Sequence, residues 1–202
     1  MPYLAEDFRS LLPEQQLREL QLSGSVVVGL RADNTVGFTN AAWARFAKQN
    51  NGGGAVEDWR GSLIEAVSPE LRGFYLKLFE TARATGEPQD HRYQCSDKEK
   101  YREFMLRVLP LPSGALILIH HKVLETPHGW ERGTVGDQYR NADGFVVQCS
   151  HCRRTRRADD PLTWDWVPAY LERQAGISHG LCGHCFRHYY EEFEGAPEEG
   201  QL

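Results

Sequence analysis

The stretch YREFMLRVLPLPSGALILIHHKVL, residues 101–124, contains two apolar runs that a short polar turn separates. The turn, LPSG at 111–114, combines proline, serine and glycine, each of which favours a tight turn for its own steric reason. Two strand-like runs joined by such a turn are typical of a β-hairpin. The stretch therefore predicts paired strands at 101–111 and 115–124.

Working outward, three further runs have strand character: SVVVGLR (25–31), TVGFTN (35–40) and DHRYQCS (90–96). Helical periodicity occupies residues 13–21, 41–50 and 68–85. Asn40 and Ser68 are expected to cap the last two of these helices. Because we expect the helices on one side only, the order predicts an α+β fold with an antiparallel sheet that has one covered face.

The composition is that of a globular chain of 202 residues with a formal net charge of −5. This charge argues against non-specific binding of nucleic acid by the whole chain. No stretch approaches the roughly 20 apolar residues that span a bilayer. The N-terminus does not have the pattern of a signal peptide, so we expect a cytoplasmic protein with reduced thiols and no membrane contact.

Two segments carry a resemblance to a known family. TNAAWARFAKQNNGG (39–53) resembles the first-helix motif of a bacterial PAS subgroup, and residues 93–123 are similar to the last three strands of that subgroup. The resemblance implies a five-stranded antiparallel sheet with flanking helices that acts as a sensor or a dimerisation module. It implies no particular ligand.

These patterns divide the chain into five expected parts: a helical cap (1–22), a PAS-like sensor (23–125), a linker (126–145), a small zinc-stapled α/β module (146–193) and a disordered acidic tail (194–202). A ligand pocket in the sensor would be lined by apolar side chains, although an ordinary packed core explains the same residues. The candidate lining residues are Val27, Phe38, Trp43, Phe46, Leu78, Phe104, Leu106 and Ile117.

Two C-x-x-C pairs mark the C-terminal module: Cys149 with Cys152, and Cys182 with Cys185. Each pair places two thiolates on one tight loop, and two such loops close a tetrahedron around Zn²⁺. A complete Cys₄ set leaves no open coordination position, so the predicted zinc is structural. The segment 163–175 between the pairs is expected to form a helix. An iron–sulfur cluster, a redox dithiol or buried thiols without metal are the alternatives.

Residues 146–190 also resemble a cysteine-rich segment at the end of some bacterial signalling proteins, in CSHCRRTR (149–156), VPAYLER (167–173) and SHGLCGHC (178–185). Gly183 departs from that pattern. The basic run RRTRR (153–157) is expected to offset the charge of the metal-bound thiolates or to form a solvated surface, and binding of phosphate or nucleic acid is the alternative. Residues expected around the metal, or as an alternative ligand, are His151, Arg153, His179 and His184.

The fifth cysteine, Cys95, is either a reactive redox thiol or a half-buried strand residue. His120 and His121 end the last expected strand, and one of them could ligate a haem in the sensor pocket. A hydrogen-bonded histidine at the strand end is the alternative.

No output motif of a kinase, a cyclase or a DNA-binding helix pair follows the sensor. The expected function is therefore a non-enzymatic signal-transduction module that forms a homodimer and docks a protein partner. The alternative is a redox sensor that uses the cysteine pairs or Cys95 as reactive thiols.

Overall fold

The structure of the protein, a computed structural model, describes residues 2–50, 60–171 and 176–190. The chain divides into two compact units. The first comprises residues 1–67, 75–93 and 104–123, and the second comprises residues 68–74, 94–103 and 124–202. The expected tail at 194–202 lies outside the described residues, as does the GGG that follows Asn51.

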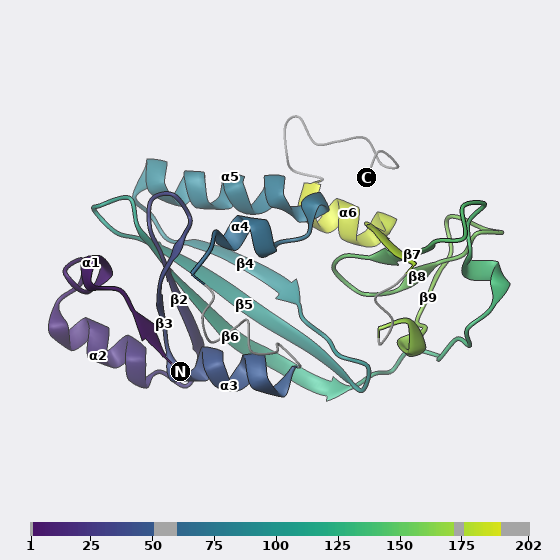
Figure 1. The fold of residues 1–202 in the computed structure, drawn as a ribbon, viewed down its shortest axis with the longest axis horizontal. Helices are drawn as coiled ribbons and strands as arrows, with labels where there is room; N and C mark the ends of the chain where they lie inside the picture. Colours follow the sequence, from purple (N-terminus) through teal and green to yellow (C-terminus); the bar gives the residue numbers. More distant parts are fainter. Residues whose placement is uncertain (1, 51–59, 172–175, 191–202) are drawn as a thin grey trace. The chain divides into compact units, whose positions relative to one another are not determined.

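A six-stranded antiparallel sheet organises the N-terminal part of the chain (Figure 1). Its strand order is β1-β3-β2-β6-β5-β4. All five expected strands are present and lie next to one another, which confirms the α+β class. The strands are β1 (Tyr3–Leu4), β2 (Val26–Leu30), β3 (Val36–Thr39), β4 (Gln89–Gln94), β5 (Lys100–Pro110) and β6 (Leu116–Pro127).

The sixth strand, β1, is not among the predicted ones. It pairs with β3 in antiparallel register, with Tyr3 opposite Thr39 and Leu4 opposite Phe38. Two residues are too few to show an alternating pattern, so only the tertiary fold reveals this strand. The segment 1–22 is therefore an edge strand and two helices, α1 (Glu6–Arg9) and α2 (Glu14–Leu22), where the sequence predicts a purely helical cap.

Between β3 and β4, the described residues form the helices α3 (Ala41–Gln49), α4 (Leu63–Ala66) and α5 (Pro69–Thr85). The predicted N-cap of α3 is confirmed, because the Asn40 side chain accepts a hydrogen bond of 3.0 Å from the Trp43 amide. Pro69 occupies the first position of α5, as the sequence predicts. The sequence does not predict the short helix α4.

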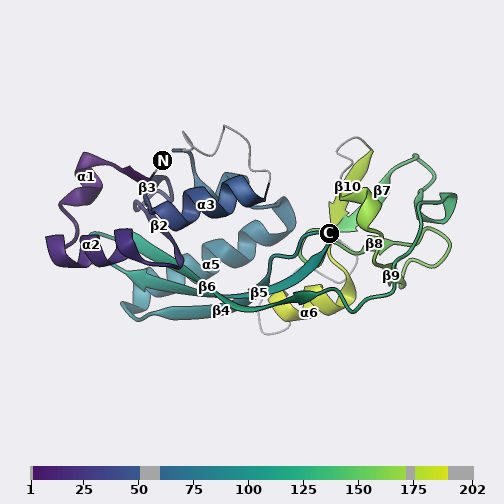
Figure 2. The same ribbon diagram turned by 90° about the horizontal axis from the view of Figure 1, so that it is seen from below.

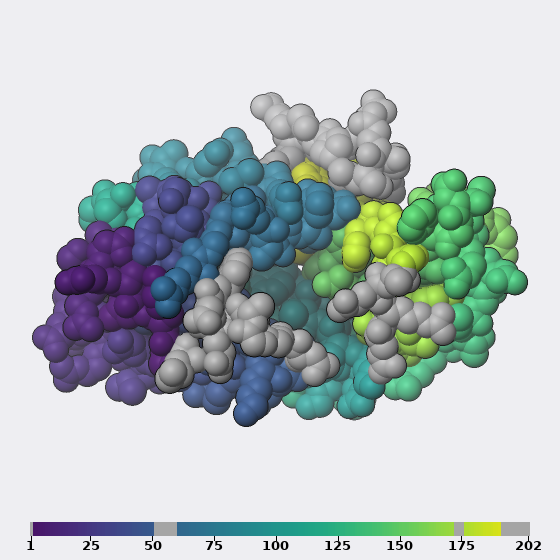
Figure 3. Space-filling model, viewed as in Figure 1, coloured from purple at the N-terminus to yellow at the C-terminus, as the bar shows by residue number. Residues whose placement is uncertain are grey.

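Both faces of the sheet are covered, which corrects the expectation of one covered face. Successive residues of a strand point to opposite faces, so Val28 and Leu118 lie in one core and Val27 and Ile117 in another. The first core packs against α3, α4 and α5. The second packs against α1 and α2, which lie next to each other in Figures 1 and 2. Figure 3 shows these N-terminal helices in purple on the outer surface.

Phe8 of α1 is the fully buried anchor of the second core. Its ring lies so close to Gly29 and Gly37 that a Cβ added at these positions would be only 2.4 Å and 2.5 Å from ring carbons. The absence of side chains at these two glycines therefore makes room for the ring, and it explains why α1 can close this face.

We expect Gly37→Ala to lower the free energy of unfolding by about 1–3 kcal/mol, because the new methyl group overlaps the Phe8 ring. Gly24→Ala is the matched control, since no atom lies within 4 Å of a Cβ at that position. Chemical denaturation of both variants measures the difference. Equal stability of the two variants would show that the packing of the Phe8 ring does not require a glycine at position 37.

The second unit contains a four-stranded sheet with the order β10-β7-β8-β9. Its strands are β7 (Val146–Cys149), β8 (Thr155–Arg156), β9 (Trp164–Asp165) and β10 (Ile177–Gly180), and helix α6 (Gly183–Tyr190) follows. Single-turn 3₁₀ helices, η2 (Asp137–Tyr139) and η3 (Pro168–Tyr170), also belong to this unit.

Two expectations for this region do not match the structure. The segment 163–175 is predicted to be helical, but its described part forms β9 and η3. Its bulky side chains Trp166, Val167 and Tyr170 are all buried, as they would also be on one face of a helix, so the apolar pattern does not distinguish the two structures. The expected linker, residues 126–145, belongs to the second unit and contributes the buried Tyr139 to a core with Val146, Val167 and Tyr170.

Among the described residues, none of the helices combines the length and the apolar character that crossing a membrane requires.

Candidate metal centre

A parallel strand pair brings the two cysteine loops together. β7 and β10 run parallel, with Gly180 opposite Cys149, and they lie side by side in Figure 2. Parallel strands end at the same edge of a sheet. The first cysteine loop (residues 149–152) begins at the end of β7, and the second (residues 182–185) begins two residues after β10. The pairing therefore delivers both loops to one place.

Backbone hydrogen bonds shape each loop. In the first, the Arg153 amide donates to the Cys149 carbonyl at 3.0 Å, and the Cys149 amide donates to the Arg154 carbonyl at 2.8 Å. Arg153 has a left-handed backbone with φ of 64°, which turns the chain sharply. In the second, the Phe186 amide donates to the Cys182 carbonyl at 2.8 Å, so Cys185 sits in the first turn of α6.

The four sulfur atoms of Cys149, Cys152, Cys182 and Cys185 lie within 4.8 Å of one another, and all four residues are buried. The sulfurs of Cys152 and Cys182 are 3.8 Å apart, far beyond a disulfide bond. A zinc–sulfur bond of about 2.3 Å gives a tetrahedron with edges of about 3.8 Å. The donor set therefore fits a tetrahedral thiolate site for a divalent ion such as Zn²⁺.

Hydrogen bonds from the protein reach two of the sulfurs. The Cys182 amide donates to the Cys149 sulfur at 3.5 Å. The His151 ring lies with Nδ1 3.3 Å from the Cys185 sulfur, while Nε2 accepts a hydrogen bond of 2.7 Å from the Gln94 amide. Burial lowers the pKa of His151 to about 4, so the ring carries one proton. That proton is on Nδ1, and His151 donates it to sulfur.

The sulfurs also act on one another. Hydrogen bonding from Cys152 holds the pKa of the Cys149 thiol far below its usual range, whereas the Cys149 sulfur raises the pKa of Cys185. One thiolate thus forms at the expense of another. Four thiolates together in a buried place require a cation to balance them.

The surrounding residues differ partly from those expected. His151 contacts the sulfurs, but His179 and His184 are exposed and lie outside the sulfur group. Trp130 packs against the four cysteines, although it lies in the expected linker. The sequence offers no spacing rule that would have pointed to it.

The basic run RRTRR does not act as one unit. Arg157 forms an ion pair with Asp159 at 2.7 Å and lies 3.8 Å from Asp165. The guanidinium of Arg154 instead lies 4.7 Å from the ring centre of Trp130. Arg157 therefore interacts with carboxylates, whereas Arg154 packs on an aromatic ring.

The eight residues proposed to line a sensor pocket do not form one lining. Val27, Phe38 and Ile117 belong to the core beneath α1 and α2, on the opposite face from the others. The remaining five lie on the face that α3 and α5 cover; they are Trp43, Phe46, Leu78, Phe104 and Leu106. The prediction overlooked that adjacent strand positions face opposite ways.

Cys95 has the surroundings of a structural residue. Its thiol is half-buried, and burial raises its pKa, which disfavours the reactive thiolate. Its amide donates a hydrogen bond of 3.1 Å to the Arg102 carbonyl. These observations do not favour the redox role that is one alternative for this cysteine.

The two histidines considered for haem both make hydrogen bonds through Nδ1. His120 lies 2.8 Å from the Tyr93 hydroxyl, and His121 lies 2.8 Å from the Ser25 hydroxyl. Tyr93 in turn stacks on Phe104, with ring centres 5.5 Å apart. This packing accounts for His120 as a hydrogen-bonded strand residue, and the donor set does not indicate a haem.

Acid is expected to destabilise the first unit through His120. Burial lowers its pKa to about 4, from about 6.5 in the unfolded chain. Between these values the unfolded chain binds more protons, so stability falls as the pH falls, by up to about 3 kcal/mol.

The measurement is denaturation of the wild type and of His120→Gln at pH 7.5 and pH 4.5. The variant keeps an acceptor for Tyr93 but has no proton to bind, so its loss of stability on acidification should be smaller. An identical loss in both proteins would show that His120 is not the group that titrates.

The fold and the site together define an α+β protein with a second small sheet and a cluster of four cysteines able to hold a metal ion. No protein-family model matches the chain, and no curated protein matches it. Among solved structures, it is similar to a domain of an HTR-like protein from Haloarcula marismortui ATCC 43049, with a TM-score of 0.39 and 16% identity. That match covers 50% of this chain and 100% of the other, and it is too weak to assign a fold or a function.

Proposed function

We propose that this chain is a signalling module without catalytic activity, in which a PAS-like unit senses a signal or pairs with a second copy. A structural zinc unit then binds a protein partner in a reducing compartment such as the cytoplasm. The observation that carries the proposal is the buried cluster of four sulfurs. Four thiolates fill every position of a tetrahedral zinc and leave none for a reacting water.

The PAS-like assignment is supported by the sheet. The five strands that the resemblance implies are neighbours in one sheet, with the first, β2, next to the last, β6. Helices α3, α4 and α5 pack on one face, and the motif at 39–53 supplies α3 and its cap.

A coupling between metal and sensor is supported by the two residues inside the first cysteine loop. Ser150 donates a hydrogen bond of 2.9 Å to the Glu70 carboxylate in the first turn of α5. His151 accepts one from the amide of Gln94, at the end of β4. The later residues of α5 and the earlier residues of β4 belong to the first unit. Loss of the metal would therefore disturb contacts of two elements that also contain sensor residues.

The experiment is affinity capture from the source cells with the full chain, comparing the wild type with Cys182→Ser. A partner retained by the wild type and lost by a variant whose first unit stays folded supports the proposal. Light scattering of the purified chain reports the expected homodimer. A protein that shows turnover, or that cycles between dithiol and disulfide without metal, contradicts the proposal and favours the redox alternative.

A further inference from the structure

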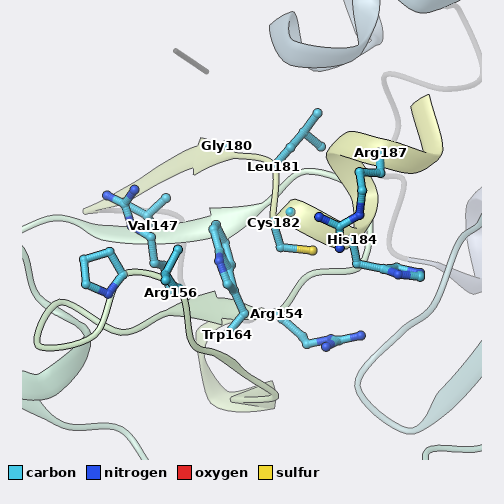
Figure 4. A pocket seen from close by; sticks show the side chains of 12 residues that line it. Val147, Arg154, Arg156, Trp164, Gly180, Leu181, Cys182, His184 and Arg187 are labelled. Atoms are coloured by element: carbon cyan, nitrogen blue, oxygen red, sulfur yellow. The ribbon is translucent and has the colours of Figure 1, made fainter. Parts of the chain in front are cut away.

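The second unit contains a pocket of about 610 Å³ beside the second cysteine loop. Its polar lining is basic: Arg154, Arg156, Arg187 and His184 contribute, and none of the described residues that line it is an aspartate or a glutamate. Trp164 provides an aromatic wall. In Figure 4 its indole stands in the middle of the pocket, with Arg156 on one side and Arg154, His184 and Arg187 on the other.

The local structure explains why these side chains converge. Arg156 and Trp164 are directly opposite in the antiparallel pair β8–β9, so they project to the same face. Arg154 precedes Arg156 by two residues, which repeats that direction along an extended chain. His184 and Arg187 are three residues apart on α6 and share one face of the helix.

The described lining of the pocket contains three arginines and no carboxylate, and it lies beside the second cysteine loop. Four thiolates and one Zn²⁺ sum to −2, whereas the three arginines contribute +3. The Nε atom of Arg154 is buried and has no hydrogen-bond partner within the part of the chain that the structure describes. Arg157, by contrast, is held by Asp159 and does not line the pocket. The Arg154 guanidinium lies 4.7 Å from the ring centre of Trp130, so this contact holds a positive charge at the wall of the pocket.

We propose that this pocket binds a small phosphate that carries a planar ring, of the nucleoside monophosphate class. Guanidinium groups match phosphate oxygens in paired hydrogen bonds, and an indole face stacks on a base. The volume of about 610 Å³ falls within the range of about 300–1,000 Å³ for small-ligand sites. The net charge of −5 disfavours a long polyanion, which favours a free nucleotide over a nucleic acid.

The proposal adds a ligand site to the zinc unit and does not require the sensor role. It is tested by isothermal titration calorimetry of the full, zinc-loaded chain with AMP, GMP, CMP and UMP. Adenosine and inorganic phosphate are titrated separately, and each is expected to bind at least about tenfold more weakly than the best nucleotide, because each lacks one half of the contacts.

Arg156→Gln is expected to weaken nucleotide binding by about 10- to 100-fold, which is the range for a lost charge-assisted contact. Arg157→Gln is the matched control, with the same charge change one residue away and outside the pocket, and it should alter affinity less than about twofold. Zinc content is measured in both variants, so that a lost fold is not mistaken for a lost contact.

Three results would overturn the proposal. They are no binding of any nucleotide at millimolar concentration, equal weakening by the two arginine variants, and tighter binding of a single-stranded oligonucleotide than of any mononucleotide. The last would assign the pocket to nucleic acid.

Discussion

Cys149→Ser is expected to abolish metal binding and to unfold most of the second unit. A serine hydroxyl stays protonated and is a poor zinc ligand, so three sulfurs remain around an ion that prefers four. The strands β7 and β10 depend on the site, because both end at the cysteine loops. Chelation of the wild type should produce the same state.

The expected loss exceeds about 5 kcal/mol, since structural zinc supplies about 10–16 kcal/mol in small zinc-binding peptides. Hydrogen exchange of the β7 and β10 amides, together with zinc content, measures it. Cys95→Ser is the matched control, because this thiol lies outside the sulfur cluster. It should keep the zinc and change stability by less than about 1 kcal/mol. A Cys149→Ser protein with protected strand amides would show that the metal does not hold the unit together.

Asn40→Asp is expected to have the second largest effect, although it changes one atom. Asn40 is fully buried, and its Oδ1 accepts hydrogen bonds from the amides of Val27 and Trp43. Its Nδ2 donates to three carbonyl groups, one in the last turn of α2 and two in the segment that leads to β2. These are the carbonyls of Leu20, Ser23 and Ser25, at 3.2, 3.3 and 2.8 Å.

An aspartate would turn a second oxygen toward those three carbonyls, so a buried charge would face acceptors. We expect a loss of about 3–5 kcal/mol in the free energy of unfolding. Asn40→Ser keeps the helix cap but not the donors, and it should lose about 1–3 kcal/mol. Urea denaturation of the zinc-loaded variants provides the comparison. If the aspartate variant is as stable as the serine variant, a carboxylate oxygen facing the three carbonyls has no destabilising effect; if both are as stable as the wild type, the Nδ2 hydrogen bonds do not stabilise the fold.

Much of the fold could be predicted from local patterns. The hairpin at 101–124 and the cap at Asn40 depend on residues close in sequence, and both are present. The four cysteines could be grouped because C-x-x-C spacing reports a loop geometry by itself. The structure brings these sulfurs together as expected.

The remainder depends on contacts between distant residues. Phe8 covers the second face only because Gly29 and Gly37 leave space for its ring, and no periodicity shows this. The 163–171 segment has the apolar content of a helix, but its pairing with β8 makes it a strand and a turn. The packing of Trp130 against the four cysteines, and the basic pocket, likewise depend on contacts between residues that are far apart in the sequence.

The most direct test of the account is native mass spectrometry of the full chain, purified under reducing conditions without added metal or ligand. The account predicts one zinc ion per chain, retained by the wild type and by Cys95→Ser and absent from Cys149→Ser. A wild-type protein that is free of metal and keeps the same fold would contradict the claim that four thiolates hold a structural ion.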